Sequence, residues 1–239
     1  NMKAKYKFYA TLLDSFQRYI DSSETWEKFF TEKYTFDEYE QMAKNEFIDK
    51  INRVPFLSEA ADKGTSFNQL IDCLINGVLT ENIKEVEINY TIKYNDFEFT
   101  FNKELCDTIA DYFSGSVSQY FTESVLNTTL GAVNLYGYID ELTPFKTVDI
   151  KTTGSYSAFK FRKNWQHKVY PYCLINEGIN CREFEYFVVE FAKETKIHKE
   201  IYLFKDKYIN DLIDICEKLI LFIEENKSLI TDKKIYSEV

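Results

Sequence analysis

The chain has 239 residues, of which 45% are hydrophobic and 17% aromatic, with only 7 Gly and 3 Pro. This length suits one domain and this composition can bury a sizeable core, which excludes wholesale disorder and a linker-rich layout. The formal net charge of −10 argues against nucleic acid as a partner, unless positive charge is concentrated on one stretch.

Cysteine and histidine usage excludes several classes of metal site. The five cysteines are scattered without a C-x-x-C pair, which predicts free thiols in a reducing cytoplasm rather than a zinc or iron–sulfur site. Two histidines are too few for a His-rich metal site. No signal peptide or apolar run of about 20 residues is present, so we expect a soluble cytoplasmic protein without membrane contact.

The first quarter of the chain is predicted to be helical. Residues 6–20 carry apolar side chains at helical spacing, and the TFDE sequence at 35–38 is typical of a capping box that opens a helix toward Ile51. Gly64 is expected to lead into the next helix and Gly77 to end it.

The middle of the chain changes to strand periodicity. Residues 86–102 alternate between apolar and polar around a turn at 95–96, which predicts a hairpin. A short helix is expected at 103–112, followed by strands at 117–129 and 133–140.

The last third combines strands and helices. We expect strands at 147–152, 183–192 and 200–204, a helix at 165–175, and a final amphipathic helix at about 207–225.

Together these elements predict one domain over residues 1–239. Its fold class is α/β or α+β: a central mixed β-sheet flanked by helices, with an N-terminal helical segment of about residues 1–60 and a C-terminal helix within about 207–230.

Two aspartates and a lysine stand out in the segments GYID and VDIK. Because side chains alternate along a strand, Asp149 and Lys151 share one face. If Pro144 and Phe145 are the turn residues between the two strands, Asp140 lies directly opposite Asp149, with Cβ atoms about 4.5–5.5 Å apart. A longer loop would shift this register by one residue.

Facing carboxylates repel each other, and a divalent cation between them removes the repulsion. Oxygen ligands at this spacing suit Mg²⁺ or Mn²⁺, and Lys151 is then placed to contact a phosphate or the attacking water. The alternative is that D-x-K is an exposed polar strand edge, which is the commoner explanation when this short pattern is considered alone.

The segment after Lys151 adds groups that suit a phosphate. Gln166 and Tyr170 share one face of the predicted helix, although Tyr170 also suits a core position. Five basic residues and no acidic one lie between positions 151 and 170, which indicates either a nucleic-acid contact or a solvated loop.

The ordered set G-x-x-D, D-x-K and Q-x-x-x-Y resembles the RecB-like and phage exonuclease branch of the PD-(D/E)XK nuclease superfamily. The resemblance implies a restriction-endonuclease-like core and Mg²⁺- or Mn²⁺-dependent cleavage of DNA. It also implies that the Ile150 carbonyl is a metal ligand. Residues 64–72 resemble a family helix with a metal-binding histidine, but Asn68 stands there, and an amide is a weaker ligand. Glu123 is similar to an acidic residue that some members place near the metal.

The expected function is therefore a DNA nuclease, with exonuclease action favoured, in recombination, repair or phage DNA metabolism. The expected catalytic residues are Asp140, Asp149, Lys151, Gln166 and Tyr170. The expected metal ligands are Asp140, Asp149, Ile150, Glu123 and, more weakly, Asn68. The expected DNA-binding residues are Lys160, Arg162, Lys163, His167 and Lys168.

Several alternatives stay open at this point. The chain could be an inactive nucleic-acid-binding or interaction protein on the same fold, or an unrelated structural protein. The acidic bulk suggests that a recombination or replication partner loads it on DNA. The sequence does not decide strand preference, cleavage polarity or oligomeric state. Replacing Asp149 or Lys151 by alanine is expected to abolish cleavage at a nearly unchanged melting temperature.

Overall fold

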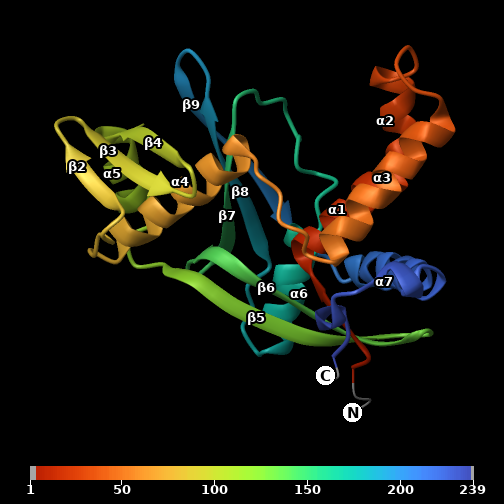
Figure 1. Cartoon of the computed structure of the whole chain (residues 1–239). Helices are drawn as coiled ribbons and strands as arrows, with labels where there is room; N and C mark the ends of the chain where they lie inside the picture. The colour runs from red at the N-terminus through yellow and green to blue at the C-terminus, as the bar shows by residue number, and fades with distance from the viewer. Residues whose placement is uncertain (1–3, 238–239) are drawn as a thin grey trace.

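Two β-sheets organise the protein, whose computed structural model describes residues 4–237 (Figure 1). The larger sheet has six strands: five follow the order β1-β6-β7-β8-β9, and β5 pairs along the whole length of β6; the smaller sheet has the order β2-β3-β4. The β1–β6 and β7–β8 pairs are parallel and the remaining pairs are antiparallel. Helices flank this central mixed sheet, as the sequence predicts.

The N-terminal segment begins with a strand, so the prediction of an all-helical start is wrong at β1 (Tyr6–Tyr9). Tyr6 and Phe8 are buried while the residues between and after them are half-exposed, and β1 pairs in parallel with β6. This period of two extends over only four residues, so the helical spacing that follows it obscures it. The neighbouring helices are α1 (Ala10–Ile20), α2 (Ser22–Phe29) and α3 (Phe36–Ile51).

Helices α2 and α3 project together away from the sheet as an arm (Figure 1). The predicted capping box is confirmed: Thr35 accepts from the backbone of Glu38, whose side chain accepts from the Thr35 backbone.

Helix α4 (Glu59–Ile75) begins earlier than predicted because Ser58 caps it by accepting from Ala61 N. Gly64 consequently lies inside the helix, where a Cβ atom would come within 3.0 Å of Thr152 Oγ1. The residue therefore permits close packing of α4 on β7 rather than starting the helix. Gly77 follows the helix with a φ of +69°, as expected for its C-terminal turn.

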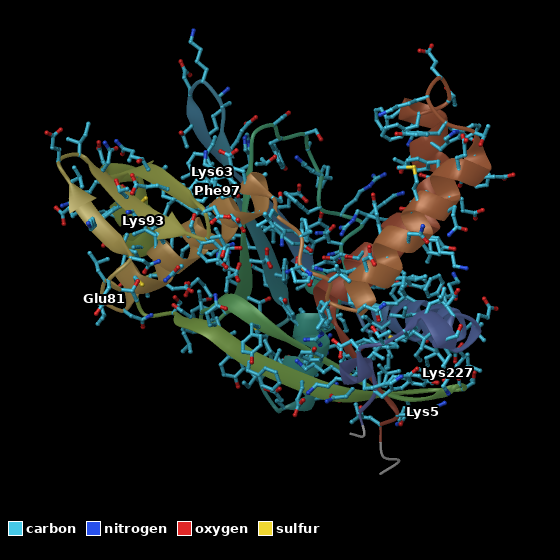
Figure 2. The ribbon with its side chains drawn as sticks, in the orientation of Figure 1. Lys5, Lys63, Glu81, Lys93, Phe97 and Lys227 are labelled. Atoms are coloured by element: carbon cyan, nitrogen blue, oxygen red, sulfur yellow. The ribbon has the colours of Figure 1, made fainter. Side chains whose placement is uncertain are left out.

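The smaller sheet forms a lobe at one side of the molecule (Figures 1 and 2). It consists of β2 (Ile83–Val86), β3 (Asn89–Tyr94) and β4 (Phe97–Asn102), and α5 (Lys103–Tyr112) follows. The predicted hairpin is confirmed as β3–β4, with Asn95 in the left-handed region at φ 50°. Strand β2 adds a third member that the sequence did not predict as separate.

The remaining elements agree closely with the prediction. They are β5 (Val117–Thr128), β6 (Gly131–Leu142), β7 (Lys146–Thr153), α6 (Gln166–Asn176), β8 (Glu183–Phe191), β9 (Thr195–Leu203) and α7 (Tyr208–Glu225). Two short 3-10 turns, Lys227–Leu229 and Lys233–Ile235, end the described chain. Strand β9 starts five residues before its predicted start. Its first half is polar and has no strand pattern of its own, but it is extended because it pairs with β8.

Two hydrophobic cores meet in the central strands. The first core contains side chains of β1, β6, α1, α6 and α7. The second core contains side chains of α4, α5 and the smaller sheet. Strand β8 serves both, because Tyr186 and Val188 face the first core while Phe187 and Val189 face the second. The five cysteines are free, as predicted. None of the helices within residues 4–237 has the length and apolar character needed to cross a bilayer.

Candidate active site

The β6–β7 hairpin has the predicted register next to the turn, but its pairing ends before Asp140 and Asp149, which were expected to lie directly opposite each other. Glu141 pairs with Val148 and Leu142 with Thr147, and Thr143 N donates to Lys146 O at 3.0 Å to close the turn. Beyond these two pairs the strands separate, and the Asp140 side chain enters the gap.

Asp140 replaces the missing ladder contact with its own carboxylate. Its Oδ2 accepts from Ile150 N at 2.8 Å, so the aspartate is held by the backbone of the strand that carries Asp149. Local separation of two paired strands thus places a carboxylate beside the next strand's backbone.

Asp149 is 3% exposed and contacts two of the other predicted residues directly. Lys151 Nζ lies 2.7 Å from its Oδ2, and Gln166 Nε2 donates to its Oδ1. Gln166 Nε2 also lies 3.4 Å from the hydroxyl of Tyr170, one helical turn further along α6. The structure therefore brings Asp149, Lys151, Gln166 and Tyr170 into one contact group.

Asn68 completes the opposite wall of the site from helix α4. Its Nδ2 donates to Asp140 Oδ2 at 3.2 Å and to the Ile150 carbonyl at 3.3 Å. Its Oδ1 is buried and has no hydrogen-bond partner among the described residues. One amide group thus spans two oxygens that the motif resemblance implies as metal ligands.

Gly137 has a steric role in this arrangement. A Cβ atom there would lie 2.5 Å from Tyr170 Cε1, a distance that carbon atoms do not tolerate. The glycine of the G-x-x-D pattern is required because the Tyr170 ring lies against the backbone of β6.

The pKa values of Asp140 and Lys151 both depend on burial and on Asp149. Burial, followed by the Asp149 carboxylate, raises the pKa of Asp140 well above its usual range. Burial by itself lowers the pKa of Lys151, but Asp149 and then Asp140 outweigh it, so the pKa is raised and the ammonium stays charged. One lysine does not neutralise two buried carboxylates.

These groups line an open cavity of about 380 Å³. Its lining residues are Tyr9, Ala10, Thr11, Arg53, Asn68, Tyr136, Gly137, Tyr138, Asp140, Asp149, Ile150, Lys151, Gln166 and Tyr170. The sequence patterns did not predict Tyr9, Arg53, Tyr136 or Tyr138 as part of the site. No local pattern marks them, although Tyr136 and Tyr138 flank Gly137 within the motif segment.

A further buried acid, Asp14 of α1, contacts the start of helix α6 next to the site. Its Oδ1 accepts from Trp165 N, at the start of the helix that carries Gln166. Burial raises the pKa of Asp14 to about 6, and the nearby Lys151 works in the opposite direction. Asp14 therefore fixes the position of α6 relative to α1.

The donor set fits a hard cation. Asp140, Asp149, the Ile150 carbonyl and the partnerless Asn68 Oδ1 are all oxygen donors, the type that Mg²⁺ and Mn²⁺ prefer. Over residues 4–237 there is no cluster of three His, Cys, Asp or Glu side chains that could hold a metal ion. Such a cation would therefore depend on the two aspartates together with neutral oxygens.

Glu123 does not belong to the site, which corrects its assignment as a ligand. On β5 it lies opposite Tyr136, four residues before Asp140 along β6, or roughly 13 Å at the rise of a strand. Its carboxylate accepts from Asn134 Nδ2 at 2.9 Å.

His167 is a core residue and not a DNA contact, nor does it lie on the surface. It is 3% exposed, and its ring stacks on Tyr202 with centroids 4.3 Å apart. Helix α6 is buried on most sides, so the residue after Gln166 points into the core rather than outward.

The basic segment is engaged by other protein groups at several positions. Lys163 pairs with Asp21 and Glu24, at 2.9 and 3.2 Å, and Lys168 pairs with Asp211 at 2.9 Å. Lys160 Nζ donates to Thr153 Oγ1 and Ser155 O. Arg162 is exposed. None of the four lines the cavity, so its chemistry does not depend on them.

No protein-family model matches the sequence. A search of curated proteins also finds no relative. Among solved structures, the chain is similar to a protein named SSO0001, with 13% identity, a TM-score of 0.45, and coverage of 92% of this chain and 78% of that one. It is also similar to a candidate exonuclease from Eubacterium rectale, with 14% identity, a TM-score of 0.45, and coverage of 79% and 76%. These likenesses are too distant to assign a family or an activity.

Proposed function

We propose that this chain is a Mg²⁺- or Mn²⁺-dependent phosphodiester hydrolase that cleaves DNA. One observation carries the proposal: Asp140 and Asp149, from adjoining strands, line one cavity whose two basic residues are Lys151, which pairs with Asp149, and Arg53, which pairs with Asp232 instead. Buried carboxylates in such an arrangement are costly unless a cation joins them. The raised pKa of Asp140 expresses that cost in the cation-free protein.

The residues that would hold the cation are Asp140, Asp149, the Ile150 carbonyl and the Asn68 amide oxygen. When bound, the cation supplies a more acidic water and offsets the charge that develops on the phosphate. A half-turn of the Asn68 amide would exchange its Nδ2, which now contacts Asp140 and Ile150, for the partnerless Oδ1.

Lys151 is the group suited to the reacting phosphate. Its ammonium has three donors, of which the structure shows one contact, to Asp149. The remaining donors can bind a phosphate oxygen or orient the attacking water, and its raised pKa keeps it charged through neutral pH. Lys151 therefore both positions the nucleophile and balances charge.

Gln166 and Tyr170 act as positioning residues. Gln166 fixes one Asp149 oxygen, and Tyr170 lies behind Gln166 against Gly137. Arg53 stands at the open side of the same cavity, where its guanidinium suits an incoming phosphate. Exonuclease action in recombination, repair or phage DNA metabolism is the finer proposal, supported by the motif resemblance.

The proposal is tested with labelled linear, circular, single- and double-stranded DNA in Mg²⁺, Mn²⁺ or EDTA. We expect cleavage with either cation, none in EDTA, and a loss of at least about a hundredfold in Asp149→Asn and Lys151→Ala. Cleavage of linear but not circular DNA would identify an exonuclease. Lys93→Ala, at an exposed lysine of the small sheet, is the matched control.

Cation binding is measured separately by Mn²⁺ titration with electron paramagnetic resonance. Wild type should bind Mn²⁺ and Asp149→Asn should bind it at least tenfold more weakly. DNA binding without cleavage under every cation condition would favour the alternative of an inactive binding protein. A fully active Lys151→Ala variant would contradict the role given to that residue.

A further inference from the structure

The cavity opens onto a face of the main sheet that carries exposed aromatic rings. Four rings contribute: Tyr9 of β1, Tyr136 and Tyr138 of β6, and Phe121 of β5. Ring centroids lie 5.8 Å apart for Tyr9–Tyr136, 6.3 Å for Phe121–Tyr136 and 5.1 Å for Phe121–Tyr138. We call these four residues the ring row.

Two rings of the ring row are exposed to solvent, and those of Tyr9 and Tyr136 are half-buried. Tyr138 is 55% exposed and Phe121 40%, whereas aromatic rings on strands normally pack into a core. Three of the four rings, those of Tyr9, Tyr136 and Tyr138, also line the cavity that holds Asp140 and Asp149. The row therefore begins at the candidate active site and leads away from it.

Basic side chains accompany the rings in spite of the acidic total charge. Lys7 Nζ lies 4.7 Å from the Tyr136 ring centroid, and the Arg53 guanidinium lies 5.6 Å from that of Tyr9. Arg53 also donates to the Tyr136 hydroxyl at 3.3 Å. Its φ of 55° is in the left-handed region, which is unusual for arginine, and marks a constrained position at this junction.

A second cavity of about 610 Å³ continues the same surface. It shares Arg53 and Tyr136 with the first and adds Lys7, Lys233 and Lys234. Asp232 is the acidic member, and it pairs with Arg53 at 3.0 Å. Within residues 4–237, no carboxylate lies within ion-pair distance of those three lysines, although Lys233 Nζ donates to the Ile230 carbonyl at 3.3 Å.

We infer that the ring row and this second cavity bind a single strand of nucleic acid that extends from the candidate active site. Bases stack on the rings of Tyr138, Phe121 and Tyr136, and phosphates contact Lys7, Arg53, Lys233 and Lys234. Flat rings interleaved with cations suit unpaired bases, since every base has a stacking face and a duplex keeps its faces covered. The inference rests on the proposed function and specifies its substrate as single-stranded.

The position of the acidic residue Glu123 agrees with this path for the phosphates. Glu123 lies on the same face of β5 but is engaged by Asn134, and it lies beside Tyr136 rather than within the second cavity. The phosphates therefore follow the lysine side, toward the chain ends, and not the β5 side.

The test is fluorescence anisotropy in EDTA, where no cleavage occurs, with labelled oligothymidylate, oligouridylate and a blunt DNA duplex. We expect the single strands to bind at least tenfold more tightly than the duplex. Oligothymidylate and oligouridylate differ in the sugar and in the base methyl group, and tight binding of either single strand supports the inference. Duplex binding equal to or tighter than that of both single strands would overturn it.

Variants assign the contacts. Tyr138→Ala and Phe121→Ala should each weaken single-strand binding about tenfold, whereas Tyr138→Phe should bind like wild type because it keeps the stacking face. Lys7→Ala and Lys234→Ala should each reduce the slope of log affinity against log salt by about 0.7. These side chains lie on the surface, and circular dichroism checks that each variant is folded.

The control variants are Phe29→Ala, at a 73% exposed ring of the helical arm, and Lys93→Ala, on the smaller sheet (Figure 2). Both should bind like wild type. Ring-row variants with wild-type affinity for single strands would overturn the inference even if the protein cleaves DNA. Single-strand binding that depends on the ring row, without cleavage under any cation, would leave the inference standing and defeat the proposed function.

Discussion

Gly137 links a short sequence pattern to a steric requirement. The Tyr170 ring occupies the space where a side chain would project, and Gln166 and Phe184 limit the ring's movement. Gly137→Ala should therefore destabilise the protein by about 1–3 kcal/mol through overpacking. Urea unfolding at equilibrium measures this loss.

A double-mutant cycle separates the ring contact from other effects of alanine. In a Tyr170→Ala background the space is free, so Gly137→Ala should cost much less than it does in wild type. Strictly additive losses would show that Tyr170 is not what requires the glycine.

Lys151 has a structural as well as a chemical role. The sequence alone predicted that Lys151→Ala would leave the melting temperature nearly unchanged, but the ion pair to the buried Asp149 revises this. In EDTA we expect a loss of roughly 2–3 kcal/mol, below that of a fully buried pair because the lysine is partly exposed. Added Mn²⁺ should restore most of it.

Thermal unfolding with and without Mn²⁺ measures that difference. Lys151→Arg keeps the charge and serves as the matched control, with stability close to wild type. A Lys151→Ala protein that is equally stable in EDTA and Mn²⁺ would show that the carboxylates do not need a cation.

At the site, the sequence predicted the relative positions of residues where the geometry is local. Asp140, Asp149 and Lys151 lie on a hairpin whose register follows from a short turn, and Gln166 and Tyr170 are one helical turn apart. Tyr9 and Arg53 were not predicted because tertiary structure brings them to the site. Tyr9 is placed by the parallel pairing of β1 with β6, and Arg53 follows the end of α3; no local periodicity indicates either position.

At the scale of elements, helix α6 shows how burial alters a titration. Burial, followed by the charge of Lys168, lowers the pKa of His167 to about 3. In the unfolded chain the pKa of this histidine is about 6.5. Between these values the unfolded state binds a proton that the folded state does not, so this contribution to stability is lost as pH falls from about 6.5 to 3.

His167→Phe keeps the stacking on Tyr202 and removes the titration. Over that window wild type should lose up to about 1.4 kcal/mol per pH unit from this residue, and the variant should lack that loss. The measurement is the difference between their unfolding free energies at a series of pH values. Parallel curves for the two proteins would contradict the buried neutral histidine.

Element boundaries were predicted best where capping residues mark them. The Thr35 capping box and the turn at Asn95 stand as predicted. Strand β1 and the polar half of β9 were missed because neighbouring strands recruit them, and Gly64 was misassigned because its close approach to Thr152 is a tertiary contact.

For the whole molecule, the two cores share strands and should unfold together. Val148 and Ile150 of β7 pack against the smaller lobe, while Tyr186 and Val188 of β8 pack against the other core. We expect one cooperative thermal transition, with coincident midpoints from far-ultraviolet circular dichroism and tryptophan fluorescence. Both tryptophans lie outside the smaller lobe, so a separately melting lobe would split the two midpoints.

Strand β6 carries both the ring row and Asp140, which fixes a distance scale for the substrate. Side chains two residues apart on one face of a strand are separated by roughly 6.8 Å, about twice the rise of a stacked base. A single nucleic-acid strand lying along Tyr136, Tyr138 and Asp140 would therefore have to be stretched, so that its neighbouring bases no longer stack on each other. The spacing of side chains along β6 would thus hold the nucleic-acid backbone in an extended conformation at the bond to be cleaved.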